Sequence, residues 1–196
     1  ENGSRIPRNL FVGQMIGQKI EEMDGTSDHF EPWKIVSIFR DPISIVLSLR
    51  FMDAKNSFST LIDSDKEIDK AAVLESLQGS ISRDDPSGWA ICKWFDEVFS
   101  NELGVDVYRQ PFNHEKNYSL IRGQRFDVLL LKYEQLDTAY KYGVAELLQV
   151  DTQRLELLNS NIHRQKEYDE LHKYVKNNFK LPRSFCEKVY NTRFMQ

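Results

Sequence analysis

The sequence predicts an α/β fold with a mainly parallel sheet flanked by helices. Short apolar runs typical of buried strands alternate along the chain with stretches whose apolar residues recur at helical spacing. The run FDVLLLKY at residues 126–133 is apolar almost throughout, as expected of a strand covered on both faces. Strands separated by helices favour parallel pairing, although three short central strands leave room for an antiparallel element.

Length and composition exclude several classes of protein. The chain has 196 residues without a repeat or low-complexity linker, so we expect a single domain over residues 1–196. A net charge of −4 argues against a nucleic-acid or membrane-surface binder. Two cysteines are too few for a disulfide framework or a zinc site, and no metal is expected. No apolar run is long enough to span a membrane and no signal peptide is visible, so we expect a cytoplasmic protein. The sequence does not indicate its oligomeric state.

The first elements place an arginine at a strand end. Residues 9–23 carry apolar side chains at helical spacing and predict a helix. Residues 35–39 are typical of a buried strand. Asp41 and Pro42 suit the N-cap and first turn of a following helix. Arg40 is therefore expected at the carboxyl end of a strand beside a helix N-terminus, where α/β proteins bind ligands.

The remaining segments alternate between helical and strand patterns. Further helices are expected at 71–77, 87–103, 137–148, 164–179 and 182–191. Further strands are expected at 105–108, 118–121 and 126–133. Residues 53–69 are charged and hydroxyl-rich and predict a loop or irregular helix.

Two segments resemble those of a known enzyme superfamily. KIVSIFRDPISIVLS, residues 34–48, resembles the 3′-phosphate-binding segment of sulfotransferases that use 3′-phosphoadenosine 5′-phosphosulfate (PAPS). That segment is an apolar strand, then an Arg, often followed by Asp/Glu-Pro, and then a Ser eight residues after the Arg. The matches here are Arg40, Asp41, Pro42 and Ser48. FDVLLLKYEQL, residues 126–136, is similar to a strand of the same family that ends in Tyr-Glu-Asp-Leu, with Gln135 replacing the Asp.

A third resemblance is narrower. The run WFDEVFSNELGVDVYRQPFNHEKNY, followed near the end by KLPRSFCEKVYNTRF, looks like the capsular polysaccharide synthesis branch of that superfamily. The resemblance covers most of the chain from about residue 30 onward. It implies a P-loop-like three-layer sandwich. Its first strand and its phosphosulfate loop have no counterpart in residues 1–30, and we expect them on a segment before Glu1.

The resemblance also implies roles for three residues. Arg40 would bind the 3′-phosphate with its planar fork of donors, and Ser48 would add a hydroxyl. The N–H groups of the helix after Pro42 favour an anion in the same place. Tyr133 would contact the adenine end. Each residue also has a structural interpretation: Arg40 as partner of a carboxylate, Ser48 bonded to its own helix, and Tyr133 as a core aromatic.

The implied enzyme transfers a sulfuryl group from PAPS to a hydroxyl of a carbohydrate or other small acceptor. It needs a general base but no metal, and the candidate bases are His114 and His29 in loops. Two alternatives stay open. One is a non-catalytic nucleotide-binding or assembly subunit of the same fold. The other is a small-molecule kinase-like P-loop enzyme, which would need a Walker-type lysine loop that the sequence lacks.

Overall fold

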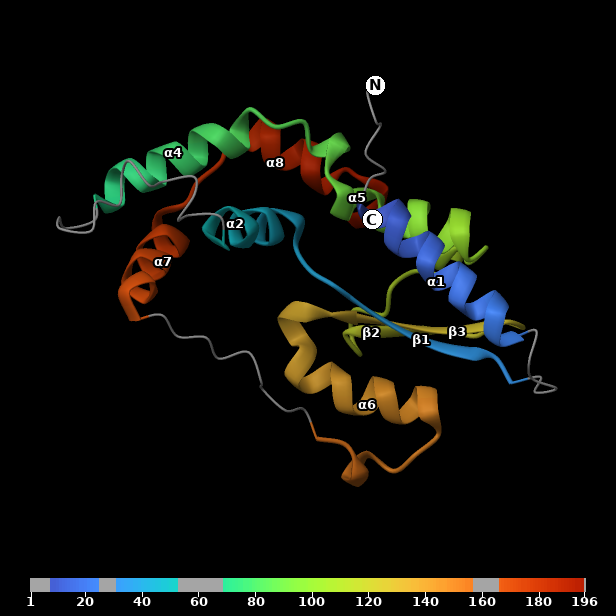
Figure 1. Cartoon of the computed structure of the whole chain (residues 1–196). Coiled ribbons are helices and arrows are strands. Elements are labelled where there is room, and N and C mark those ends of the chain that lie inside the picture. The colour runs from blue at the N-terminus through green and yellow to red at the C-terminus, as the bar shows by residue number, and fades with distance from the viewer. Residues whose placement is uncertain (1–7, 25–30, 53–68, 157–165, 196) are drawn as a thin grey trace, which may run out of the picture. The chain divides into compact units, whose positions relative to one another are not determined.

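The computed structural model describes residues 8–24, 31–52, 69–156 and 166–195. Two compact units emerge from the contacts within the chain (Figure 1). The first comprises Glu1–Arg40 and Ala90–Leu158, and the second Asp41–Trp89 and Asn159–Gln196. The single domain expected over residues 1–196 stays a prediction.

The first unit contains a small mixed sheet. Its strands are β1 (Trp33–Phe39), β2 (Tyr118–Ile121) and β3 (Phe126–Lys132), in the order β1-β3-β2. β1 runs parallel to β3, whereas β2 runs antiparallel to it. The short connection between β2 and β3 explains this, because a parallel crossover needs a dozen residues or more. The α/β class is thus confirmed, and the predominantly parallel sheet is corrected to one parallel and one antiparallel pairing.

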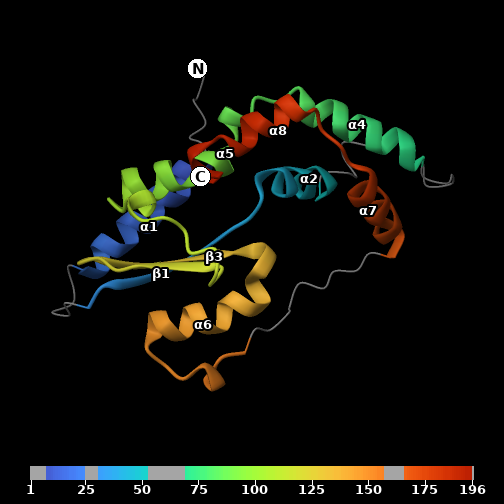
Figure 2. The same ribbon diagram turned by 180° about the vertical axis from the view of Figure 1, so that it is seen from behind.

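Helices flank this sheet on both faces. α6 (Leu136–Leu148) lies on one face, and α1 (Arg8–Asp24) lies on the other beside the π-helix η2 (Phe95–Glu102), as the two opposite views show (Figures 1 and 2). α5 (Ala90–Trp94) leads directly into η2. Short 3-10 turns complete the unit at η3 (Val107–Arg109), η4 (Tyr133–Gln135) and η5 (Thr152–Arg154).

The core of the first unit lies between α6 and strands β2 and β3. Leu129 and Leu131 of β3 are fully buried and pack with Tyr118, Val144 and Leu147. α6 approaches the sheet closely at Gly143, where an added Cβ would lie 3.1 Å from Leu129 and 3.2 Å from Leu131 and Tyr118. A larger side chain at this position would push the helix off the sheet.

β1 is less buried than its apolar sequence predicts. Ser37 is buried and accepts a hydrogen bond from Nε1 of Trp94 at 3.4 Å, while Phe39 packs edge-on against Phe95. Val36 and Ile38 point to the opposite face and are largely exposed. The prediction of a buried strand at 35–39 is therefore right for one face only.

Two other local predictions need correction. Residues 105–108 were expected as a strand, but Val107–Arg109 form a 3-10 turn that Asp106 caps by accepting from the N–H of Tyr108. Residues 87–103 were expected as one regular helix, but α5 passes into the π-helix η2. Gly104 follows that helix with φ +67°, a left-handed conformation that favours glycine after a helix C-terminus.

The described part of the second unit is helical. It contains α2 (Pro42–Met52), α4 (Lys70–Ser82), α7 (Lys166–Asn178), α8 (Arg183–Tyr190) and the 3-10 turns η1 (Pro86–Gly88) and η6 (Arg193–Met195). One cluster joins α4 to α7 through Val73, Leu77, Leu171 and Val175. A second joins Ile81 to Phe185 and Val189. The irregular segment expected at 53–69 falls, except for its last residue, outside the described residues.

No helix in the described part of the chain is both long and apolar enough to cross a bilayer.

Candidate functional site

Arg40 and Tyr133 meet at the carboxyl end of the parallel strand pair. Phe39 and Lys132 are register partners at the last positions of β1 and β3, so Arg40 and Tyr133 are the residues that follow. The guanidinium carbon of Arg40 lies 4.7 Å from the centroid of the Tyr133 ring, within the range of a cation–π contact. Tyr133 is 48% exposed, which excludes the core-aromatic interpretation. The predicted strand-end position of Arg40 is confirmed.

Ser48 belongs to a different compact unit from Arg40 and Tyr133. It is half-buried on α2, in the second unit, whereas Arg40 is the last residue of the first segment of the first unit. A joint contact of Arg40 and Ser48 with one phosphate stays a prediction.

Asp41 serves as the N-cap of α2, as predicted. Its Oδ1 accepts from the backbone N–H of Ser44 at 2.7 Å, and its Oδ2 accepts from the hydroxyl of Tyr190 at 2.8 Å. Both carboxylate oxygens therefore act within the second unit. The contact with Tyr190 joins residues from opposite ends of that unit's sequence, and no local pattern indicates it.

Of the two candidate bases, only His114 can be placed. It is exposed, and its ring packs edge-on against Phe112 at 5.3 Å between centroids. Phe112 in turn packs against Phe39 at 5.1 Å. This aromatic row brings His114 to the sheet edge where Arg40 and Tyr133 lie. His29 lies outside the described residues.

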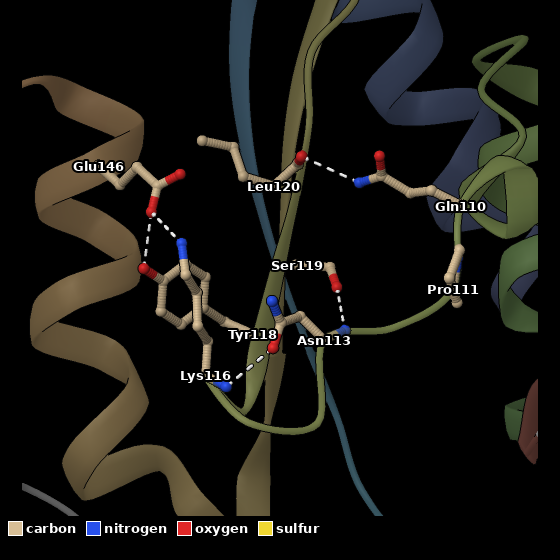
Figure 3. Close-up of a pocket in the computed structure, with 8 residues that line it drawn as sticks. All are labelled: Gln110, Pro111, Asn113, Lys116, Tyr118, Ser119, Leu120 and Glu146. Carbon is tan, nitrogen blue, oxygen red and sulfur yellow. Dashed lines mark hydrogen bonds and ion pairs between the residues drawn. The ribbon is translucent and has the colours of Figure 1, made fainter.

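A polar cavity of about 330 Å³ lies along the outer edge of β2 (Figure 3). It is bounded on one side by α6 and on the other by the loop that precedes β2. Its polar lining consists of Gln110, Asn113, Lys116, Tyr118, Ser119 and Glu146. Sequence reasoning missed this cavity, although the density of amide and hydroxyl side chains in QPFNHEKNYS was a usable signal.

Glu146 is the charged centre of this cavity. Its Oε2 accepts from the hydroxyl of Tyr118 at 2.6 Å and from Nζ of Lys116 at 3.4 Å. Burial, together with the adjacent carboxylate, raises the pKa of Tyr118 to about 12. The hydrogen bond from Tyr118 lowers the pKa of Glu146 below its ordinary value. At neutral pH the carboxylate is therefore ionised and the phenol protonated.

Hydrogen bonds fix the loop against β2. Nε2 of Gln110 donates to the carbonyl of Leu120 at 3.0 Å. The N–H of Asn113 donates to Oγ of Ser119 at 2.7 Å, and Oδ1 of Asn113 accepts from the N–H of Lys116 at 2.9 Å. The cavity wall is thus held in place before any ligand binds.

Arg122 has a structural role. Its Nη1 pairs at 2.6 Å with the buried carboxylate of Asp127, and its Nη2 donates at 2.8 Å to the carbonyl of Glu146. Arg122 thus joins β3 to the last turn of α6. Among the described residues, no three or more His, Cys, Asp or Glu side chains lie where they could share a metal ion.

Residues 60–196 match a family described as "Putative capsular polysaccharide synthesis protein". The match covers well over half of the chain. The chain belongs to this family. Comparison with curated proteins and comparison with solved structures gave no match.

The family assignment confirms the capsular polysaccharide part of the resemblance seen in the sequence. The matched segment includes Tyr133, His114 and every residue that lines the cavity. Arg40 and Ser48 lie before the matched segment.

Proposed function

We propose that this protein transfers a sulfuryl group from PAPS to a hydroxyl of a carbohydrate acceptor. The observation that carries the proposal is the contact between Arg40 and Tyr133 at the carboxyl ends of β1 and β3. Ligands of α/β proteins bind at this edge of the sheet. In the first unit, α6 covers one face of the sheet and α1 with η2 the other, as in a three-layer sandwich. A sulfotransferase-like version of that sandwich is part of the proposal.

Arg40 and Tyr133 supply the two kinds of contact that an adenosine 3′-phosphate needs. A guanidinium held over a ring still presents donors along its edges, and these match the oxygens of a phosphate. The exposed ring of Tyr133 offers a surface on which a purine can stack. Since the two side chains contact each other, base and phosphate would be bound in one place.

In the proposed reaction the acceptor hydroxyl oxygen attacks the sulfur of PAPS. An S–O bond forms, the S–O bond to the 5′-phosphate breaks, and 3′,5′-adenosine bisphosphate leaves with that electron pair. The hydroxyl proton passes to a base, for which His114 is the described candidate at this sheet edge. Positioning and stabilisation of charge on the leaving phosphate would provide most of the acceleration, as in phosphoryl transfer.

Titration with 3′,5′-adenosine bisphosphate tests the nucleotide part of the proposal. We expect the wild-type protein to bind it and to gain thermal stability, because a ligand of the native state raises the free energy of unfolding. Arg40→Ala should weaken binding at least tenfold, and Arg40→Lys nearly as much, because Lys lacks the planar fork. Tyr133→Ala should weaken it by about three- to tenfold through lost stacking.

The matched control is Arg50→Ala, which removes an arginine that pairs with Asp84 in the second unit. It should leave the dissociation constant unchanged. Absence of binding at millimolar bisphosphate, or equal binding by wild type and Arg40→Ala, would contradict the nucleotide site.

A second candidate function is a nucleotide-binding assembly subunit without catalysis. It is favoured by α1, where Gly13 and Gly17 lie inside a regular helix and Gly13 packs against Val98 of η2. Both glycines lie within the helix, and Gly13 packs against η2, so neither belongs to a phosphate loop. Radiolabelled PAPS separates the candidates: bisphosphate binding without label transfer to any capsular glycan favours the subunit. Binding that depends strictly on Mg-ATP favours the kinase-like alternative.

A further inference from the structure

We propose that the cavity beside β2 is a saccharide-binding pocket that accepts an uncharged pyranose unit. Its role as the acceptor site rests on the proposed function, whereas sugar binding itself depends on the cavity alone. The cavity of about 330 Å³ lies near the lower end of the range of small-molecule sites, roughly 300–1,000 Å³. This volume suits a sugar ring better than a nucleotide or a folded peptide.

The polar atoms of the lining alternate between acceptors and donors. Nε2 of Gln110 already donates to the carbonyl of Leu120, and Oδ1 of Asn113 already accepts from the N–H of Lys116. The opposite ends of these amides, an acceptor on Gln110 and a donor on Asn113, have no recorded partner within the described chain. Oε1 of Glu146 is likewise available, since both recorded bonds go to Oε2.

A sugar hydroxyl can satisfy such a set because it donates one hydrogen bond and accepts others. Adjacent hydroxyls on a ring can give a proton to Glu146 or Gln110 and accept one from Asn113 or Lys116. Groups that only donate, or only accept, would leave part of this lining without a partner when the ligand displaces water from it, and this weakens binding. The lining therefore favours a polyhydroxylated ligand.

The charges of the lining favour an uncharged sugar. The cavity contains one carboxylate, on Glu146, and one ammonium, on Lys116, and these two groups pair at 3.4 Å. A uronic acid would meet Glu146, and a free amino sugar would meet Lys116, so either would disrupt the pair. A neutral hydroxyl can bond to both charged groups, and hydrogen bonds to charged groups are about twice as strong as neutral ones.

Apolar contacts complete the match. Pro111 and Leu120 line the same cavity, on the loop and on β2 respectively (Figure 3). A pyranose has an apolar C–H face as well as its hydroxyls, and its partial burial against these side chains adds affinity. Preformed sites of this kind combine an apolar wall with a few placed polar groups.

The position of the cavity suits an acceptor. Asn113 and Pro111 flank Phe112, whose ring packs against Phe39, the residue before Arg40. Tyr118 is the register partner of Leu131, two residues before Tyr133. The pocket, Arg40 and Tyr133 thus lie in one compact unit, and Tyr118 and the loop around Phe112 extend the pocket wall toward the carboxyl end of β3, the edge proposed for the nucleotide.

Saturation-transfer NMR and calorimetry on the whole chain test the pocket without any nucleotide. The probes are methyl β-D-glucopyranoside, methyl β-D-galactopyranoside and N-acetyl-D-glucosamine, with D-glucuronate as the charged comparison. We expect at least one neutral probe to bind with a dissociation constant of about 1–10 mM, and more tightly than glucuronate. Glu146→Gln should weaken that binding about tenfold, as expected for a hydrogen bond to a charged group.

Asn113→Ala should weaken binding about three- to tenfold through loss of its free donor. The matched control is Glu187→Gln, which alters an exposed carboxylate paired with Arg183 on α8 and should not change binding. Glu146→Gln retains an acceptor for Tyr118, and circular dichroism will verify that each variant is folded.

The inference is overturned if none of the three neutral probes binds at about 50 mM, if glucuronate binds more tightly, or if both pocket variants bind as wild type. Sugar binding by a protein that fails to bind the bisphosphate keeps the pocket and removes the proposed function. Bisphosphate binding through Arg40 without sugar binding keeps the nucleotide part of the proposed function and removes the pocket.

Discussion

Neighbouring strands of the sheet differ sharply in burial on the same face. Val36 and Ile38 of β1 pair in register with Leu129 and Leu131 of β3. The two leucines are 0% exposed, whereas Val36 is 45% and Ile38 51% exposed. The difference arises because α6 packs on β2 and β3. Burial on this face therefore follows the position of the helix and not the apolar character of each strand.

Three contacts fix α6 over the covered strands. Gly143 allows close approach, the hydroxyl of Tyr118 bonds to Glu146, and Arg122 bonds to both Asp127 and the last turn of α6. Each contact can be removed separately, so the contrast between β1 and β3 can be tested by substitution.

The largest expected effect is at Leu131. Leu131→Ala should lower the free energy of unfolding by about 2–5 kcal/mol, because it removes a fully buried side chain and leaves a cavity. Ile38→Ala, at the register partner in β1, should lower it by less than about 1 kcal/mol. Urea denaturation of both variants measures the difference. Equal losses would show that the exposed face of β1 is covered in solution.

The next effect is at Arg122. Arg122→Ala should cost about 2–3 kcal/mol, because the buried carboxylate of Asp127 loses its charged partner. Adding Asp127→Asn should recover part of that loss, since an unpaired amide is less costly to bury than an unpaired charge. Arg109→Ala, at an exposed position, is the matched control for chemical denaturation. A cost no larger than that of the control would remove Arg122 from the contacts that fix α6.

Substitution of Gly143 should have an intermediate effect. Gly143→Val should cost about 1–3 kcal/mol, because its side chain would collide with Leu129, Leu131 and Tyr118. Gly17→Val in α1 is the control, since a Cβ there meets nothing within 4 Å. Thermal unfolding compares the two. A Gly143→Val protein as stable as Gly17→Val would mean that α6 can shift without loss.

The smallest effect concerns pH and the Tyr118–Glu146 contact. Because the pKa of Glu146 is lowered in the folded protein, its stabilisation is present above its ordinary pKa and is lost as pH falls through the folded value. Because the pKa of Tyr118 is raised to about 12, its stabilisation is present below its ordinary pKa of about 10 and is lost as pH approaches 12.

Tyr118→Phe should therefore cost most between about pH 5 and pH 10, and by less than about 1 kcal/mol, because Glu146 is partly exposed and screened. Unfolding curves at about pH 3 and pH 7 suffice. The gap between wild type and variant should close at the lower pH. A gap of constant size would attribute the effect to packing alone.

Local sequence patterns predicted most of the regular elements. The strand at 118–121 was predicted with its observed bounds, and the helix at 137–148 and the strand at 126–133 to within one residue, since periodicity and neighbouring turn residues mark them. The helix at 71–77 was predicted too short because Gly79 suggested a break, yet α4 continues through it to Ser82. Alternation alone misled at 105–108, where a capping carboxylate outweighs strand propensity.

The candidate site was predictable in one half only. Arg40 was identified from its place at a strand end and Tyr133 from the resemblance of residues 126–136 to a sulfotransferase strand, and parallel pairing of β1 with β3 brings the two residues together. The polar segment before β2 could have indicated one wall of the cavity, but not the cavity itself, since Asn113, Tyr118 and Glu146 come from a loop, a strand and a helix that tertiary packing assembles. The exposure of β1 also depends on where α6 packs, which no local pattern encodes.

The first unit is assembled from two separate stretches of chain, and this determines an order of events during synthesis. β2 and β3 are near neighbours in sequence and can pair within microseconds of leaving the ribosome. β1 is made first, but its parallel partner β3 follows only after the whole segment Asp41–Trp89. Until then β1 lacks β3, the strand with which it pairs in the described structure. The nascent chain should therefore be most prone to aggregation and chaperone binding during this interval, and closing the sheet at β1 should limit the rate of folding.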